Sequence, residues 1–200
     1  SDVCSSDLIN ALPNDYEVTT AYQLLGSSIK SISLSVPSPS LLTTTATFTS
    51  QQIRFFAVYL PKAQTITGVK WMQGTAGNYT ASNYNGIGLY TYSGGTLTLV
   101  DTTTNDGNIW KSSSASIFQS KAFTQTYNAS AGIYFIAPLY CSSAQTTAPV
   151  ITSATSSGYY LDLTNNAKIT STINTITSLP STQAMSGTTA STTNMGFWLY

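Results

Sequence analysis

The clearest alternation of apolar and polar residues lies between Asn85 and Asp101, in the stretch NGIGLYTYSGGTLTLVD. This pattern predicts two strands, Ile87–Tyr92 and Thr96–Asp101, joined by a turn at Ser93-Gly94-Gly95. Glycine suits that turn because tight hairpin loops need residues at positive φ. The period of two is typical of a sheet with one buried face. The residues expected to alternate across the first strand are Ile87, Leu89 and Thr91 on one face and Gly88, Tyr90 and Tyr92 on the other.

Further short strands are predicted along the rest of the chain, and two of them are apolar almost throughout. Gln52–Leu60 is therefore expected to be a central strand, and Gly132–Tyr140 is expected to be buried. The other predicted strands are Leu41–Thr49, Thr65–Gln73 with a candidate bulge at Gly68, Ile117–Thr124, Gly158–Leu163, Thr170–Ile176 and Met195–Tyr200. The segments predicted as loops or turns are Gly74–Gly86, Thr102–Asn108, Tyr127–Ala131, Ser142–Ala148 and Leu179–Gly187, with Ile109–Ser116 as a short helical or irregular crossing.

Strands at this spacing, with no amphipathic helix longer than two turns, predict an all-β protein. We expect a single antiparallel β-sandwich of jelly-roll type over residues 41–200, preceded by an extended segment, a linker or edge strand, over residues 9–40. Pro37 and Pro39 keep the end of that segment out of a sheet interior, because proline has no N–H to donate.

The first eight residues, SDVCSSDL, resemble the in-frame translation of a common sequencing-adapter primer. We therefore expect residues 1–8 not to be natural protein and the native chain to extend further upstream. On this interpretation Cys4 is an artefact and Cys141 has no partner. The alternative is a genuine N-terminus with a Cys4–Cys141 disulfide, which the sequence leaves open.

The composition is low in charge, with 7% charged residues and a formal net charge of zero over the whole chain. Without Asp2 and Asp7 the balance becomes seven basic against five acidic residues, a net charge of +2. Neither value suggests a nucleic-acid partner. No apolar run approaches the roughly 20 residues of a membrane helix, so no membrane insertion is expected. The hydrophobic content of 42% and the regular strand pattern argue against disorder.

Catalytic chemistry finds little support in the residue types. The chain has no histidine, which excludes Ser-His-Asp and Cys-His catalysis and removes the commonest zinc ligand. Asp101 and Asp106 flank a turn and are the one candidate pair of glycosidase carboxylates, but Asp is also a standard turn residue. Cys141 is interpreted as a small buried residue rather than a nucleophile. We predict a protein that is not an enzyme and has no cofactor.

The same turn, DTTTNDGN, is also a candidate calcium loop. Asp101, Asn105 and Asp106 could supply oxygen ligands, but the segment lacks the ligand spacing of an EF-hand. A plain turn is the favoured interpretation, and no metal site is predicted. Asn78-Tyr79-Thr80 and Asn128-Ala129-Ser130 match the glycosylation sequon, a motif short enough to arise by chance.

Aromatic residues give the more useful hypothesis, because aromatic rings stack on the apolar faces of sugars. Tyr79 and Tyr84 fall in the polar Gly74–Gly86 segment and are expected to be exposed, with Asn78 and Asn83 beside them to bond to sugar hydroxyls. Trp110 is a further candidate for glycan binding. The favoured interpretation of both Trp110 and Trp71 is that they fill the core of the sandwich.

Four runs of the sequence resemble a β-sandwich domain of tailed-bacteriophage structural proteins, of the tail-fibre, baseplate or receptor-binding type. The runs are VYLPKAQTITGVKWMQ (Val58–Gln73), GNYTASNYNGIGLYTYSGGTLTLV (Gly77–Val100), NIWKSSSASIFQSKAF (Asn108–Phe123) and AGIYFIAPLY (Ala131–Tyr140). The resemblance covers about Leu41 to Tyr200, and it agrees with an origin of the adapter-like segment in environmental (metagenomic) DNA.

This resemblance implies a non-enzymatic virion module located outside the host cell. Its expected partners are other virion proteins and further copies of itself, since such receptor-binding proteins are commonly trimeric, and a host cell-surface saccharide. An alternative from another class is a carbohydrate-binding module or adhesin domain of a secreted bacterial protein. A third is a polysaccharide lyase or glycosidase that uses Asp101 and Asp106.

Overall fold

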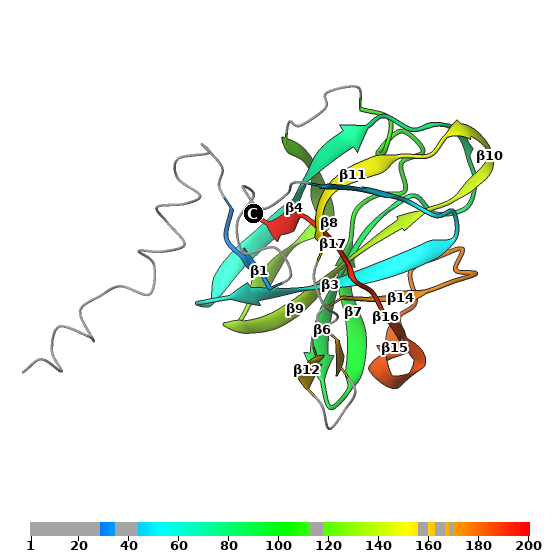
Figure 1. The fold of residues 1–200 in the computed structure, drawn as a ribbon. Coiled ribbons are helices and arrows are strands. Elements are labelled where there is room, and N and C mark those ends of the chain that lie inside the picture. Colours follow the sequence, from blue (N-terminus) through cyan, green and yellow to red (C-terminus); the bar gives the residue numbers. More distant parts are fainter. Residues whose placement is uncertain (1–28, 35–43, 113–117, 156–159, 163–166, 169) are drawn as a thin grey trace, which may run out of the picture.

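The computed structural model describes residues 29–34, 44–112, 118–155, 160–162, 167–168 and 170–200. Within these ranges the chain forms antiparallel strands that build two main sheets and two small ones (Figure 1). The all-β sandwich predicted from the strand pattern is confirmed.

The larger sheet has eight strands in the described part of the chain, with β1 (Ile32–Ser33) paired beside β3. Its seven other strands, in spatial order, are β15 (Thr182–Ala184), β7 (Thr96–Thr102), β6 (Gly86–Ser93), β9 (Gly132–Tyr140), β3 (Gln52–Leu60), β14 (Thr170–Ile173) and β16 (Thr189–Ala190). β3 and β9 have the bounds predicted for the two apolar runs and lie in the middle of this sheet, which confirms the central place expected for β3 and the burial expected for β9.

The second main sheet packs over the first and has six strands in the described ranges. These strands are β17 (Thr193–Met195), β11 (Val150–Thr155), β4 (Gln64–Thr75) and β18 (Phe197–Leu199), with β2 (Thr44–Thr47) paired to β11 and β8 (Phe118–Ala129) paired to β4. The β4–β8 pairing shifts register between Ile66 and Gly68, which confirms an irregularity at the predicted bulge.

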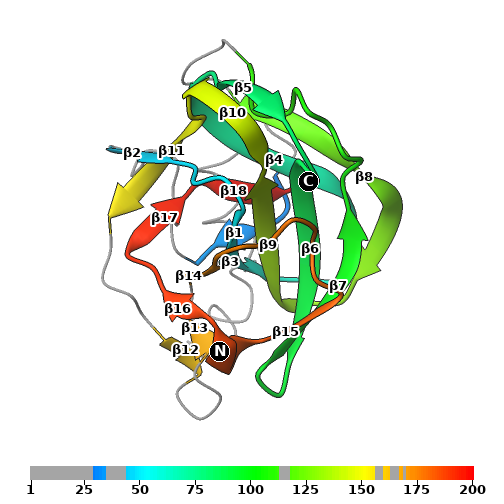
Figure 2. The same ribbon diagram turned by 90° about the vertical axis from the view of Figure 1, so that its right-hand side faces the viewer.

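Two small sheets and one short helix complete the described elements. β5 (Asn78–Ala81) pairs with β10 (Ser142–Thr147), and the two strands lie side by side at the upper end of the sandwich in Figure 2. β12 (Tyr160–Asp162) pairs with β13 (Ala167–Lys168). A single 3₁₀ turn, η2, covers Met185–Gly187.

The predicted hairpin is present as β6 and β7. Gly94 and Gly95 form its turn with φ values of 53° and 80°, in the region that favours glycine. Leu97 and Leu99 of β7 face the same cluster of apolar side chains. The expectation of one buried face is wrong, because Ile87 and Leu89 pack between the two sheets while Tyr90 is fully buried on the opposite face.

The core between the sheets is rich in large rings and branched side chains. β3 contributes Phe56, Val58 and Leu60, and the facing strand β4 contributes Ile66, Val69 and Trp71. Phe197 of β18 stacks on Phe56 with ring centroids 5.4 Å apart. Trp71 and Trp110 meet edge to face at 5.4 Å, so the interpretation of both as core residues is confirmed.

A second apolar cluster lies on the outer face of the larger sheet and explains why its central strands are apolar on both sides. Phe55 of β3 and Phe135 of β9 belong to it, and Tyr90 of β6 contacts Phe55 edge to face at 5.4 Å. The segment that follows β14, together with the first residue of η2, covers this face through Ile176, Leu179 and Met185. That cover is what buries the second face of the hairpin.

Several segments predicted as loops contain strands instead. Ser142–Ala148 contains β10, Gly74–Gly86 contains β5, and β8 continues through Ala129 into the predicted Tyr127–Ala131 loop. Leu179–Gly187 contains β15 and η2, and Val150–Thr155 forms β11 without having been predicted. These strands are short or polar, so their sequences lack a sustained alternation of apolar and polar residues. The β5–β10 pairing also has two register shifts, which interrupt any regular pattern.

The N-terminal predictions fall largely on residues that are not described, including 1–8 and the whole of 9–28. Within the segment predicted as extended or edge strand, Ile32 pairs with Tyr59 and Ser33 with Val58 at the side of β3. Cys141 is buried as a free thiol, and Cys4 lies outside the described residues.

Candidate functional site

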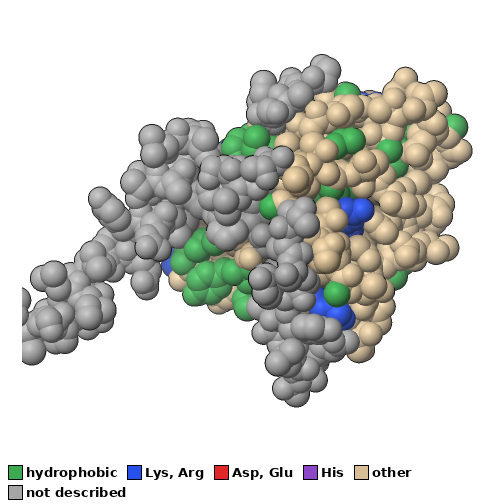
Figure 3. Space-filling view, in the orientation of Figure 1, with side chains coloured by type: hydrophobic (Ala, Val, Ile, Leu, Met, Phe, Trp, Pro, Cys, Tyr) green, Lys and Arg blue, Asp and Glu red, His purple; other side chains and the backbone are tan. Residues whose placement is uncertain are grey.

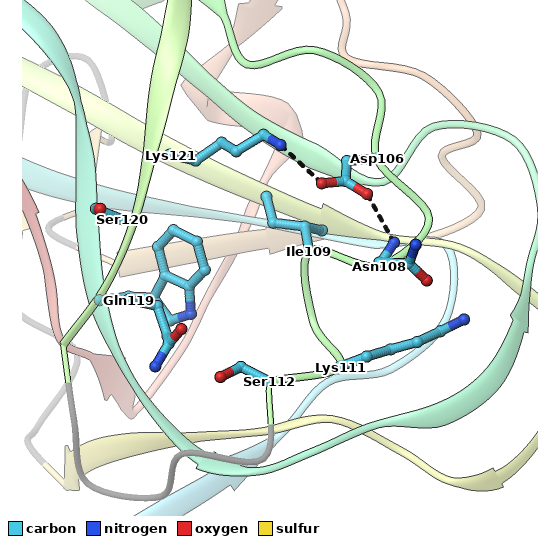
Figure 4. A pocket seen from close by; sticks show the side chains of 9 residues that line it. Asp106, Asn108, Ile109, Lys111, Ser112, Gln119, Ser120 and Lys121 are labelled. Carbon is cyan, nitrogen blue, oxygen red and sulfur yellow. Dashed lines mark hydrogen bonds and ion pairs between the residues drawn. The ribbon is translucent and has the colours of Figure 1, made fainter.

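A hollow among the described residues lies between one edge of the sandwich and the turn that follows β7. It has a volume of about 360 Å³. Its walls are β4, β8 and the Asp106–Ser112 turn, and the residues that line it are Trp71, Asp106, Asn108, Ile109, Lys111, Ser112, Gln119, Ser120 and Lys121. Figure 4 shows the labelled polar side chains arranged around Ile109. We call this hollow the β8 pocket.

Hydrogen bonds to the β6 strand and to the loop before it hold the turn in place. Thr103 N donates to the Ile87 carbonyl over 2.9 Å, and Ile87 N donates to Thr103 Oγ1 over 3.0 Å. Asp106 N donates to the Asn85 carbonyl over 2.9 Å. The chain then turns sharply, because Asn108 N donates to Asp106 Oδ1 over 2.9 Å in the manner of an Asx turn.

Gly107 allows this turn to lie against β5. A Cβ atom at Gly107 would lie 2.8 Å from the Cβ of Ala81, which is closer than real Cβ atoms approach. A side chain at this position would therefore push the turn away from β5 and alter the wall of the β8 pocket.

Trp110 anchors the turn from below. Its indole is fully buried, its Nε1 donates to the Leu139 carbonyl over 3.2 Å, and its ring lies 4.7 Å from that of Phe48. The Trp110 carbonyl accepts hydrogen bonds from Gly77 N at 2.9 Å and from Gln73 Nε2 at 3.1 Å. With Trp110 fixed in the core, its neighbours Ile109 and Lys111 are held at the pocket.

A part-exposed ion pair forms one side of the pocket. Lys121 Nζ lies 2.7 Å from Asp106 Oδ2, and the two side chains are 30% and 31% exposed. The hydrogen bond from Lys121 and then the one from Asn108 N lower the pKa of the Asp106 carboxyl below its ordinary value. Asp106 therefore stays ionised at neutral pH, and both charges face the pocket (Figure 4).

Lys111 lines this pocket and also contacts Tyr79, a residue of a second, smaller hollow. Its ammonium stands 4.7 Å from the centroid of the Tyr79 ring in a cation–π contact. Tyr79 in turn lines a hollow of about 200 Å³ over β5 and β10, together with Asn78, Thr80, Ala144, Gln145 and Thr146. The contact between Lys111 and Tyr79 thus pairs one lining residue of each hollow.

The residues predicted to bind a glycan are separated by the fold. Asn78 lies exposed on β5, but Tyr79 beside it is 6% exposed and packs edge to face on Tyr140 at 4.8 Å. The expectation that Tyr79 is exposed is wrong, because β5 turns that ring inward. Trp110 is fully buried and offers no ring face to a ligand.

Tyr84 and Asn83 are not among the residues that line either hollow. Tyr84 is half-buried rather than exposed, and its hydroxyl donates to the Thr103 carbonyl over 2.7 Å. Asn83 is exposed at a φ of 50°, and its carbonyl accepts a hydrogen bond from Asn105 Nδ2 at 3.1 Å. Both residues therefore help to hold the loop before β6 against the turn after β7.

The three residues of the candidate calcium loop each bond to other protein groups. Asp101 Oδ1 accepts from Thr124 Oγ1 at 2.8 Å and from Thr102 N at 2.7 Å. Asn105 Oδ1 accepts from Asn85 N at 2.9 Å, and Asp106 pairs with Lys121. Across the described ranges, no group of three or more His, Cys, Asp or Glu side chains is placed to hold a metal ion. The hydrogen bonds of these three side chains hold the end of β7 and the turn that follows it.

Sequence reasoning did not single out Lys111, Gln119 or Lys121, which line the β8 pocket. One signal was available, since the chain has only seven basic residues and two of them fall within the eleven positions from Lys111 to Lys121. The pairing that brings the turn to β8 depends on long-range contacts, and these leave no local pattern.

The surface shown in Figure 3 is mostly uncharged, with isolated Lys and Arg side chains. No helix in the described part of the chain has the length and apolar character needed to cross a membrane. Comparison with known proteins found no match to this chain among protein-family models, curated proteins or solved structures.

Proposed function

We propose that this chain is a non-enzymatic β-sandwich module that binds saccharides in the β8 pocket. The observation that carries the proposal is the lining of the pocket, in which amide, hydroxyl, ammonium and carboxylate groups surround a floor of Ile109 and of the small part of Trp71, 2% of its surface, that is not buried in the core. Sugars present the matching combination of hydroxyl groups and apolar ring faces. The volume of about 360 Å³ is within the range of small-molecule sites, roughly 300–1,000 Å³.

The state of Asp106 supports binding rather than catalysis. A glycosidase needs one carboxylic acid with a raised pKa to protonate the leaving group. Lys121 shifts the pKa of Asp106 in the opposite direction, and Asp101 is engaged by Thr124 and by its neighbour's N–H. Both carboxylates act as fixed hydrogen-bond acceptors in the fold.

For the biological setting we propose a bacteriophage virion protein of the tail or receptor-binding type, whose target is a host cell-surface glycan. The support is the sequence resemblance over about Leu41 to Tyr200 and the low charge of the chain. A secreted adhesin or carbohydrate-binding module would use the same pocket chemistry. The neighbouring genes separate the two settings: capsid and tail genes indicate a virion, and glycosidase or secretion genes indicate the adhesin.

A glycan array probed with the full chain tests the proposal. The pocket variant is Asn108→Ala with Gln119→Ala, and a matched control is Gln125→Ala with Asn128→Ala, which removes the same two residue types from the exposed far end of β8. We expect specific binding by the wild type and the control and at least a tenfold loss in the pocket variant. Urea denaturation of all three proteins shows whether the pocket variant remains folded.

Two results would overturn the proposal in different parts. Binding that survives in the folded pocket variant would remove the site from the β8 pocket while keeping the saccharide-binding role. Absence of binding by every protein, at concentrations that detect millimolar affinity, would remove the role itself.

A further inference from the structure

The β8 pocket carries a net positive charge although the whole chain is neutral. Two lysines, Lys111 and Lys121, and one aspartate, Asp106, line it, so two positive charges and one negative charge leave a balance of +1. Lysines are scarce in this protein, so the presence of two of them at one pocket indicates that the pocket attracts a negatively charged ligand.

Of the two lysines, Lys111 is the one whose ammonium N–H groups are not used by the residues that the structure describes. Its ammonium contacts the face of Tyr79 at 4.7 Å, and no group in the described part of the chain accepts a hydrogen bond from it. A ring face stabilises the charge but leaves the N–H groups unused, and an ammonium has three of them. The contact holds the Lys111 ammonium against Tyr79, which lines the second hollow, and leaves its N–H groups for a ligand.

Lys121 adds a second charge to the same pocket. One of its N–H groups is engaged by Asp106 Oδ2 at 2.7 Å, and the pair is part-exposed, so an anion that enters the pocket meets further donors of Lys121. Asp106 opposes such an anion by its own charge. The two lysine charges thus exceed the one carboxylate charge, and the pocket keeps a net positive charge.

We propose, building on the saccharide-binding function above, that the preferred ligands of the β8 pocket are acidic saccharides. Their carboxylate or sulfate group binds the Lys111 ammonium, with Lys121 as the second cation, while the amide and hydroxyl groups of the lining bind the sugar hydroxyls. Hydrogen bonds between ions are stronger than those between neutral groups, and a lysine, as a point charge, accepts either anion.

The test is a glycan array that presents neutral, carboxylated and sulfated saccharides, probed with the full chain and four variants. Lys111→Gln removes the charge, and Lys111→Arg keeps it. Asp106→Asn removes the opposing carboxylate but keeps the Oδ1 acceptor that Asn108 N uses. The matched control is Lys70→Gln, because Lys70 also stands over a tyrosine ring, that of Tyr200 at 5.5 Å. Its neighbours on β4, Val69 and Trp71, both point into the core. Since side chains alternate along a strand, Lys70 points to the opposite side, away from the pocket.

We expect the acidic saccharides to bind and Lys111→Gln to weaken them about tenfold, with Lys111→Arg and Lys70→Gln close to the wild type. Asp106→Asn should strengthen the same ligands several-fold, a gain that a merely structural role of Asp106 would not produce. Salt at about 1 M, where the screening length is about 3 Å, should reduce these differences. Comparison of the carboxylated with the sulfated saccharides identifies the anion.

The outcomes separate this inference from the proposed function. Binding restricted to neutral saccharides, or acidic binding that Lys111→Gln and Lys70→Gln affect equally, would overturn the preference for acidic ligands and leave saccharide binding in place. No binding to any class would overturn the proposed function and the inference with it.

Discussion

The side chain of Asn85 and the backbone of Cys141 bond to each other in both directions. Cys141 N donates to Asn85 Oδ1 over 3.0 Å, and Asn85 Nδ2 donates to the Cys141 carbonyl over 2.9 Å. Both residues are fully buried. The same asparagine uses its backbone to hold the turn after β7, through Asn105 Oδ1 and Asp106 N. Asn85 therefore links the junction of β9 and β10 to the turn that forms the β8 pocket.

Replacement of Asn85 by alanine should destabilise the protein by about 1–3 kcal/mol. The change leaves the N–H of Cys141 buried without a partner, which costs about that much, whereas the Cys141 carbonyl keeps the hydrogen bond from Ser82 N at 3.1 Å. Urea denaturation measures the effect. Asn78→Ala, at an exposed position of β5, is the control and should change the free energy of unfolding by less than about 0.5 kcal/mol. Equal effects of the two changes would show that the Asn85–Cys141 bonds contribute nothing specific.

The turn of the β6–β7 hairpin gives a prediction about backbone conformation alone. Gly94 has a φ of 53°, and a Cβ added there would meet no atom within 4 Å. Gly94→Ala should therefore cost about 1 kcal/mol from backbone strain without any steric clash. Gly94→Asn should cost less, because asparagine adopts the left-handed region more readily. The free energies of unfolding of the two variants decide this, and a larger loss for asparagine would contradict it.

The sequence predicted the elements whose patterns are local. The apolar runs of β3 and β9 and the glycine turn of the β6–β7 hairpin each carry their own signal, and all three are present. The one-sided burial expected for the hairpin failed for a tertiary reason. Met185 and Leu179, some ninety residues away in the chain, cover the face that holds Tyr90. The sequence pattern within Asn85–Asp101 gives no sign that this face is covered.

The candidate site was less accessible to sequence reasoning. Tyr79 was predicted to be exposed in a polar segment, but its inward orientation depends on the pairing of β5 with β10, which is short and irregular. Lys111 lies next to a tryptophan that was correctly interpreted as core. The burial of Trp110 is what places Lys111 at the pocket, so the site follows from a packing contact rather than from a motif.

The Asp106–Lys121 pair should make stability depend on pH in the acid range. The folded state holds the pKa of Asp106 below its ordinary value of 3.8, so its contribution is present above that value and is lost as the pH falls through the folded pKa. Asp106→Asn should remove this part of the dependence. Because the pair is part-exposed, the contribution at neutral pH should be under about 1 kcal/mol.

Urea denaturation of the wild type and of Asp106→Asn at a series of pH values from neutral to strongly acid measures this contribution. The two curves should differ most near neutral pH and converge in strong acid. Curves that run parallel over the whole range would show that the ion pair with Lys121 does not stabilise the folded state.

The contact between Lys111 and Tyr79 predicts that the ring of Tyr79, rather than its hydroxyl, supports ligand binding. The ring face lies 4.7 Å from the Lys111 ammonium, and the ring also packs edge to face on Tyr140. Burial raises the pKa of Tyr79 above its ordinary value, so the ring stays neutral in alkaline solution as well. Tyr79→Phe keeps both ring contacts and should bind acidic saccharides as the wild type does.

Tyr79→Leu keeps an apolar side chain but removes the ring, and with it the surface that positions the ammonium. A cation–π contact at such a site is worth about 0.5–1 kcal/mol, so affinity for acidic saccharides should fall about two- to fivefold. Stability should fall as well, since a buried aromatic contact is lost, and binding is therefore measured at a temperature where urea curves show the variant to be folded. If phenylalanine and leucine weaken binding equally, the hydroxyl or the local packing matters instead of the ring. If neither weakens it, Lys111 keeps its position without Tyr79.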